Sequence, residues 1–134
     1  MISALYLNLV VQDLPRAKRF FEALDWRFDP RFTNDDAGGL RISDNIFAML
    51  HTRDSIRRFT DKPVVDSHGQ VEMMAAIQLE SRAAVDALAD KAIAAGGRAQ
   101  RPAEDHGFMY IRPFEDLDGH IWEPFWMDPQ QTSA

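Results

Sequence analysis

Three side chains of this sequence stand at strand-like positions and could do chemistry: the carboxylate of Glu123, the imidazole of His51 and the phenol of Tyr6. Glu123 lies between the apolar residues Ile121 and Phe125, a setting in which a carboxylate can serve as a general base. The hydroxyl of Tyr6 could donate a hydrogen bond to a ligand oxygen. His51 could act as a base, a metal ligand or a ligand contact. We take these three as candidate catalytic residues.

Two turns of the chain echo each other and bear on whether it holds a metal. Asp118-Gly119 leads into one apolar segment, and Asp44-Asn45 leads into another. Aligning the two turns places Met49 where Glu123 stands. One copy therefore offers a carboxylate at the centre of a strand, and the other offers a thioether.

The elements that would position these residues occur twice in the same order. Period-two alternation of apolar residues predicts strands, and a stripe at helical spacing predicts helices. The first set is a strand over 5–11, a helix from Asp13 to Leu24 with Asp25 in a left-handed conformation, and strands near 26–31, 38–43 and 45–51. The second is a strand over 72–79, a helix from Ser81 to Gly96-Gly97 with the buried stripe Val85, Leu88, Ala89, Ala92 and Ile93, and strands near 98–101, 107–113 and 119–126.

The repetition predicts the domain organisation. A chain of 134 residues is of ordinary size for one domain. We expect a single α+β domain over 1–134, built from a module at about 4–52, a linker over 53–70 and a second module at about 71–127.

Composition narrows the function classes. The net charge of −6 argues against nucleic-acid binding, which leaves a basic footprint. The absence of cysteine excludes disulfides, thiolate metal sites and cysteine nucleophiles. No signal peptide is visible, and no apolar run approaches the roughly 20 residues that span a bilayer. We expect a cytoplasmic protein with no nucleic-acid or membrane partner.

Two segments carry a resemblance to a known family: Asp13-Leu14-Pro15-Arg16-Ala17-Lys18-Arg19-Phe20-Phe21-Glu22-Ala23-Leu24, and Asp116-Leu117-Asp118-Gly119-His120-Ile121-Trp122-Glu123. Together with the repeated order of elements, they make the chain resemble the vicinal oxygen chelate superfamily from about residue 4 to 127. That superfamily includes glyoxalase I, bleomycin-resistance proteins, fosfomycin-resistance enzymes and extradiol dioxygenases. The resemblance implies two βαβββ modules whose mixed sheets curve into half-barrels, with the helices outside, and it implies a homodimer.

The resemblance also implies where a metal would be held. In metal-using members the ligands come from the first and last strand of each module, which here correspond to Tyr6, Met49, Met74 and Glu123. Strand parity independently puts these four residues on one face. Divalent metals of the lyase type prefer imidazole nitrogen and carboxylate oxygen, so only Glu123 fits. We expect no metal cofactor; a rearranged site would need His51 to join Glu123.

A mostly apolar pocket with a few amides is the further expectation. The resemblance implies that the concave side of the curved sheets stays open as a pocket. From the sequence alone, the same side chains could instead fill the space between two half-sheets. By parity, Trp122 and Trp126 face the other way, and so does His120. The candidate ligand-binding residues are Asn8, Phe47, Met49, Met74, Gln78, Ile121 and Phe125.

Three functions fit these observations, and whether the protein is an enzyme stays open at this point. The first is a glyoxalase/bleomycin-resistance-like protein that binds, and in one version transforms, a small apolar or amphipathic metabolite or drug without the usual metal. The second is a metal-dependent lyase or dioxygenase with a ligand set built on Glu123 and His51. The third is a non-catalytic protein that sequesters a drug.

Overall fold

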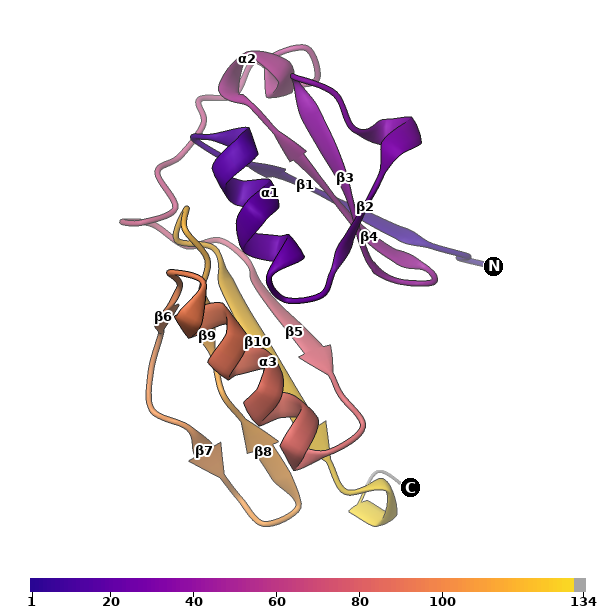
Figure 1. The fold of residues 1–134 in the computed structure, drawn as a ribbon, viewed down its shortest axis with the longest axis vertical. Coiled ribbons are helices and arrows are strands. Elements are labelled where there is room, and N and C mark those ends of the chain that lie inside the picture. The colour runs from indigo at the N-terminus through magenta and orange to yellow at the C-terminus, as the bar shows by residue number, and fades with distance from the viewer. Residues whose placement is uncertain (132–134) are drawn as a thin grey trace. The chain divides into compact units, whose positions relative to one another are not determined.

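The computed structural model describes residues 1–131, which fall into two compact units (Figure 1). Unit 1 is Met1–Val65, and unit 2 begins at Asp66. The division lies inside the predicted linker over 53–70. Each unit is a mixed α/β assembly with one main helix on one face of a sheet (Figure 1).

Unit 1 contains a four-stranded sheet in the order β1-β4-β3-β2. The strand β1 runs parallel to β4, and the other two pairings are antiparallel. Its elements are β1 (Leu5–Val10), α1 (Leu14–Glu22), β2 (Arg27–Asp29), the 3-10 helix η1 (Pro30–Phe32), β3 (Ala37–Ser43), β4 (Ile46–His51) and α2 (Arg53–Ile56).

The helix α1 begins and ends where its sequence dictates. The Asp13 side chain accepts a hydrogen bond from the backbone N–H of Arg16 at 3.0 Å, and Pro15 is tolerated in the first turn. Leu24 is buried after the last turn, and Asp25 then takes φ of 66°, so the predicted left-handed exit is confirmed. Its buried stripe is Leu14, Ala17, Phe20 and Phe21.

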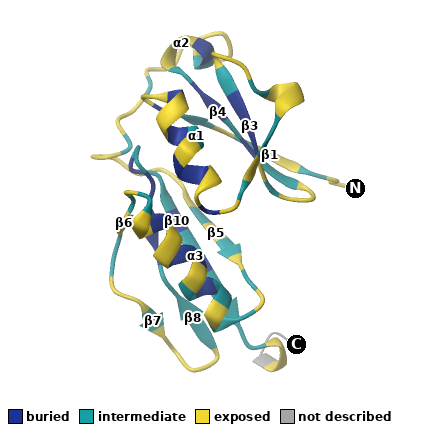
Figure 2. Cartoon of the chain, viewed as in Figure 1, coloured by how far each residue is buried: buried dark blue, intermediate teal, exposed yellow. Residues whose placement is uncertain are grey.

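One face of the unit 1 sheet forms the core against α1. Leu40, Ala48 and Leu50 point to this face and are fully buried. Figure 2 shows buried residues on the sheet side of α1 and exposed residues on its outer side. Because side chains alternate along a strand, the odd-numbered residues of β4 must lie on the opposite face.

Unit 2 is organised around one long strand, β10. It pairs in parallel with β5 along one edge and antiparallel with β9 and then β8 along the other. The elements of this unit are β5 (Met74–Gln78), α3 (Arg82–Ala94), β6 (Arg98–Ala99), β7 (Glu104–Asp105), β8 (Met109–Ile111), β9 (Phe114–Glu115), β10 (Ile121–Met127) and the 3-10 helix η2 (Pro129–Gln131).

The strand predicted over 107–113 differs from the structure. It is shorter, as β8, and a further strand, β9, follows at once. Pro113 separates them because it has no N–H to give to the ladder, although the N–H of Arg112 still donates to the carbonyl of Pro124 at 3.1 Å. The short strand β7 was not predicted either.

The predicted start, end and most of the predicted buried stripe of helix α3 are confirmed. The hydroxyl of Ser81 accepts from the N–H of Ala84 at 3.0 Å, and Gly96 takes φ of 107° just past the end of the helix. The prediction that Ile93 joins the buried stripe is wrong, because its side chain is 41% exposed. It follows Ala92 by a 100° turn, which carries it to the margin of the packed face. The buried residues are Val85, Leu88, Ala89 and Ala92.

A buried carboxylate organises the turn that starts β10. Asp116 is 5% exposed, and its Oδ1 accepts from the backbone N–H groups of Asp118 at 2.9 Å and His120 at 3.0 Å. Its Oδ2 contacts Nδ1 of His120 at 2.9 Å and accepts from Nε1 of Trp122 at 3.1 Å. Trp122 is 1% exposed, so this carboxylate ties the turn to the core.

The charge of Asp116 also acts on His120. Burial alone would lower the pKa of His120, but the hydrogen bond and the negative charge of Asp116 outweigh it and hold the pKa above its ordinary value. His120 is half-buried and engaged with the turn, in keeping with its predicted orientation away from Glu123.

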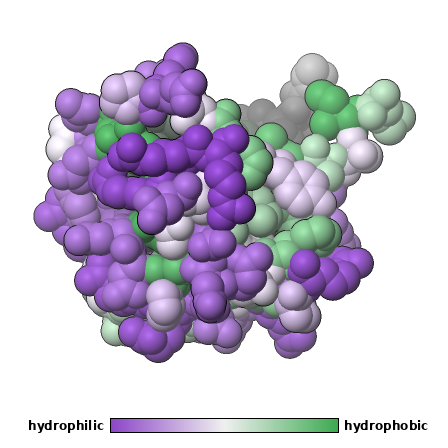
Figure 3. Space-filling view, turned by 90° about the horizontal axis from the view of Figure 1, so that it is seen from above, coloured by the Kyte–Doolittle hydropathy of each residue, from purple (hydrophilic) through white to green (hydrophobic). Residues whose placement is uncertain are grey.

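The face drawn in Figure 3 is mainly hydrophilic, with hydrophobic residues gathered toward the right of the view. Within the described residues, none of the helices has the length and apolar character needed to cross a membrane.

We predict that Asp116→Ala lowers the free energy of unfolding by about 2 kcal/mol, because it leaves the buried indole N–H of Trp122 without its acceptor and removes the partner of the half-buried His120 ring. Urea unfolding followed by tryptophan fluorescence measures this. Asp44→Asn is the matched control, since the Asp44 carboxylate is almost fully exposed and forms a surface ion pair with Arg41. Equal losses in the two variants would contradict the role given to Asp116.

Candidate functional site

Five of the predicted site residues share one face of the unit 1 sheet, the face that α1 does not cover. The register sets Tyr6 opposite Phe47 and Asn8 opposite Met49, and His51 follows two residues after Met49 on the same side. The rings of Tyr6 and Phe47 stack in parallel, with centroids 4.5 Å apart. We call this surface the Tyr6 face.

The Tyr6 face gains an aromatic residue that the sequence did not indicate. Phe32, from η1, packs against Gly39, which the register sets opposite Met49. A Cβ added at Gly39 would lie 2.8 Å from the Cβ of Phe32 and 3.6 Å from the sulfur of Met49. Glycine at this position therefore lets Phe32 approach the sheet beside Met49.

A buried hydrogen-bonded chain runs through this face. Nδ1 of His51 lies 2.9 Å from Oγ of Ser55, and Nε2 lies 2.8 Å from Oδ1 of Asn8. His51 is 4% exposed and Ser55 is 3% exposed. Ser55 is placed by α2, where Thr52 caps the helix and accepts from the N–H of Ser55 at 3.2 Å.

These contacts leave neither ring nitrogen of His51 free. Burial, with a smaller contribution from the Arg58 charge, lowers the pKa of His51. The ring is therefore neutral near pH 7, with its nitrogens engaged by Ser55 and Asn8. The geometry favours a positioning role for His51 over the predicted roles of base or metal ligand.

The remaining five predicted residues share one face of the unit 2 sheet. Ile121 lies opposite Met74, and Phe125 lies opposite Gln78, with Glu123 between them on β10. Trp122 alternates to the other face, as strand parity predicted, and is buried there. We call this surface the Glu123 face; α3 covers the opposite side of the sheet.

Glu123 is not the isolated acid that the sequence suggested. Its Oε2 lies 2.9 Å from Nη2 of Arg101, an ion pair that is partly shielded from water. Arg101 also donates to the side chain of Gln100 at 2.8 Å and reaches Glu104 at 3.4 Å. A half-buried carboxylate is stabilised by a paired cation, and the segment after β6 supplies one here.

The guanidinium of Arg101 stays protonated. Burial would lower the pKa of its guanidinium, but hydrogen bonds to Glu123 and Glu104 hold the pKa above the ordinary value. The region beside Glu123 therefore carries a fixed positive charge, which repels a second cation.

The donor set does not fit the metal that the fold family often uses. The four positions implied by the resemblance present a phenol at Tyr6, thioethers at Met49 and Met74, and an ion-paired carboxylate at Glu123. Thioether sulfur suits soft ions such as Cu(I) rather than Zn²⁺, Mg²⁺ or Mn²⁺. No group of three or more His, Cys, Asp or Glu within residues 1–131 is placed to hold a metal ion.

Ser55 and Arg101 contact the candidate site residues His51 and Glu123 and were not predicted from the sequence. Ser55 follows His51 by four residues, and the capping residue Thr52 between them was a local signal of the turn that brings them together. Arg101 had no comparable signal. Its approach to Glu123 depends on how β6, β9 and β10 pair across more than twenty residues of chain.

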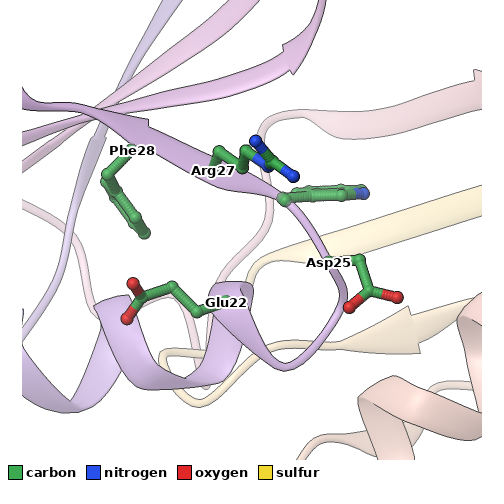
Figure 4. Close-up of a pocket in the computed structure, with 5 residues that line it drawn as sticks. Glu22, Asp25, Arg27 and Phe28 are labelled. Atoms are coloured by element: carbon green, nitrogen blue, oxygen red, sulfur yellow. The ribbon is translucent and has the colours of Figure 1, made fainter.

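One hollow on the surface of unit 1 has a volume of about 490 Å³ and is lined by none of the predicted site residues. Figure 4 shows Glu22 at the end of α1 and the ring of Phe28 pointing from β2 toward that helix. Another hollow, of about 170 Å³, lies on unit 2 and includes Ile121 of the Glu123 face.

We predict that His51 makes stability depend on pH with a definite sign. Its pKa is lowered in the folded state, so below about pH 6.5 the unfolded chain binds a proton that the folded chain does not. Stability contributed by neutral His51 is present above that pH and is lost as the pH falls, by at most about 1.4 kcal/mol per pH unit.

The test compares the wild type with His51→Gln by urea unfolding at several pH values between 7.5 and 5, a range that brackets the unfolded value. The loss on acidification should be smaller in the variant. His120 titrates in both proteins and cancels in the difference. A variant with the full wild-type loss would show that His51 is not the group responsible.

The family model for the Glyoxalase/Bleomycin resistance protein/Dioxygenase superfamily matches residues 3–123. No curated protein gives a significant match.

Solved structures similar to the chain include hypothetical protein SA1046 from S. aureus, with a TM-score of 0.78 and 25% identity, covering 94% of this chain and 95% of that one. A glyoxalase-related enzyme from Fulvimarina pelagi has a TM-score of 0.78 and 23% identity, covering 94% and 88%.

The fosfomycin resistance protein FosX from Mesorhizobium loti has a TM-score of 0.70 and 20% identity, with all of both chains covered. These likenesses confirm the predicted α+β fold with curved sheets. With a family model that spans nearly the whole sequence, they lead to one conclusion: the chain belongs to the glyoxalase/bleomycin resistance protein/dioxygenase superfamily.

Proposed function

We propose that this member of the superfamily binds a small apolar or amphipathic molecule and does so without the usual catalytic divalent metal. Each unit has its own candidate ligand surface, the Tyr6 face in unit 1 and the Glu123 face in unit 2. The chemistry of both faces supports this, because each combines apolar side chains with few polar ones, as small-molecule sites do.

The apolar part of the proposed site is rich in aromatic and thioether groups. On the Tyr6 face, the stacked pair of Tyr6 and Phe47 adjoins Met49. On the Glu123 face, Met74 is exposed and pairs across the strands with Ile121. Methionine adapts its shape to irregular ligands, and aromatic rings offer flat surfaces for stacking.

The ion pair between Arg101 and Glu123 is the observation that carries the proposal. A metal site at this position would need the carboxylate as a ligand, yet at 2.9 Å the guanidinium already neutralises it. Replacing that partner with a divalent cation would leave Arg101 half-buried beside a like charge. Glu123 can still accept a hydrogen bond from a ligand, and Tyr6 can donate one.

The two other candidate functions become outcomes of the same test. A metal-dependent lyase or dioxygenase built on Glu123 and His51 would have to break the Arg101 ion pair and the contacts of His51 with Asn8 and Ser55. A sequestering protein would bind its ligand without turnover. Fosfomycin resistance is a property of the similar protein from Mesorhizobium loti and motivates including antibiotics among the compounds tested.

We predict that the purified protein, dialysed against chelator, keeps its thermal stability and gains none from added Zn²⁺, Ni²⁺, Mn²⁺ or Mg²⁺. Small amphipathic compounds that bind should instead raise its apparent stability, by about 2.7 kcal/mol at a hundredfold excess over Kd. Differential scanning fluorimetry measures both effects, and elemental analysis measures bound metal.

The matched controls are Glu123→Gln, which removes the carboxylate charge, and Arg101→Gln, which removes its partner. Neither should change the metal content of the protein. One equivalent of metal in the wild type that disappears in Glu123→Gln would overturn the proposal in favour of the metal-dependent alternative.

A further inference from the structure

We propose that Ser55 and His51 fix the side-chain amide of Asn8 with its NH₂ group facing the ligand, so that the protein selects ligands carrying a hydrogen-bond acceptor such as a carbonyl or carboxylate oxygen. The inference rests on the proposed function and names the class of ligand. Asn8 then determines specificity, and His51 and Ser55 are positioning residues.

The hydroxyl of Ser55 determines which groups donate and which accept along this chain of hydrogen bonds. Its hydroxyl is buried, and a buried hydroxyl left without an acceptor costs roughly 1–3 kcal/mol. Among the described residues, the acceptor that this hydroxyl contacts is Nδ1 of His51, at 2.9 Å. The proton of Ser55 therefore points at Nδ1, and Nδ1 must accept it.

The tautomer of His51 then decides which group donates in the contact between His51 and Asn8. A neutral histidine with an accepting Nδ1 carries its hydrogen on Nε2. Nε2 lies 2.8 Å from Asn8 and must therefore donate to the amide oxygen. Protonating the ring would leave Nε2 a donor, so the orientation of Asn8 does not depend on the charge of His51.

The amide of Asn8 thus has one end engaged and the other free. With Oδ1 bound to His51, the Nδ2 group has no protein partner among residues 1–131, and Asn8 is exposed on the Tyr6 face. Its neighbours there are apolar or aromatic: Met49 lies directly across, and Tyr6 lies two residues along the strand. A pair of N–H donors in an apolar setting selects for an acceptor.

A flipped amide would reverse every bond in the chain. Nδ2 would donate to Nε2, Nδ1 would donate to Ser55, and the buried hydroxyl of Ser55 would lose its acceptor. The reversed arrangement is therefore disfavoured by the burial of Ser55, which lies three residues inside the cap of α2 and out of reach of water.

The first test reads the tautomer of His51 directly. Long-range ¹H–¹⁵N NMR correlations on the labelled wild type should show the Nε2–H tautomer at pH 7.5. Finding the Nδ1–H tautomer would overturn the inference. In Ser55→Ala, where the acceptor role of Nδ1 is no longer imposed, the population of the Nδ1–H tautomer should rise, whereas a purely structural role of Ser55 would leave the tautomer unchanged.

The second test uses a matched pair of probes, benzylacetone and butylbenzene, which share an apolar body and differ by one carbonyl. NMR titration should show benzylacetone binding about three- to tenfold more tightly at the Tyr6 face. The preference should vanish in Asn8→Asp, which presents only acceptors, and in Asn8→Leu. It should survive in His51→Gln, whose amide N–H can still donate to Asn8.

The outcomes separate this inference from the proposed function. Equal affinities of the wild type for the two probes would overturn the inference and leave ligand binding intact. If neither probe perturbed the signals of the Tyr6 face, the proposed function would fail there, and the inference with it. The ¹⁵N spectra of the variants show whether each one is folded.

Discussion

The placement of the unit 2 site residues depends on one buried carboxylate. A β-strand that slips by one residue sends every side chain to the wrong face, and β10 is the strand around which the unit 2 sheet is built. Asp116 prevents this slip, because it holds the turn before β10 and the indole of Trp122 at the same time. With Trp122 fixed in the core, Glu123 can only face the opposite side. The position of the candidate acid is thus set by a residue that has no part in the chemistry.

In each unit, a potentially reactive side chain of the candidate site is paired within the protein. In unit 1, His51 is shared between Ser55 and Asn8; in unit 2, Glu123 is held by Arg101. Groups of these types would serve as bases or metal ligands if they were free. Once paired, they cost less to bury and present fixed donors and acceptors. This arrangement suits recognition of a ligand more than proton transfer or metal coordination.

The parts of the fold that could be predicted from the sequence are those governed by local rules. Alternation and helical stripes located the main elements, and the capping roles of Asp13 and Ser81 follow from short polar side chains at helix starts. Strand parity assigned the site residues to the correct faces within each unit. Predictions from the sequence were wrong or missing where two local sequence patterns conflicted, or where no local pattern existed. Pro113 broke a strand that the apolar pattern continued, and Arg101 reaches Glu123 only through strand pairings that join distant parts of the chain.

The chain of hydrogen bonds through His51 also constrains how this protein can evolve. Replacing any one of Ser55, His51 and Asn8 leaves polar atoms of its neighbours without a hydrogen-bond partner. Replacing all three with hydrocarbon side chains of similar shape removes the need for partners altogether. Intermediate sequences are therefore the unstable ones. Among descendants of this protein, the three positions should be inherited as a block, either all polar or all apolar, although they span two separate stretches of the sequence.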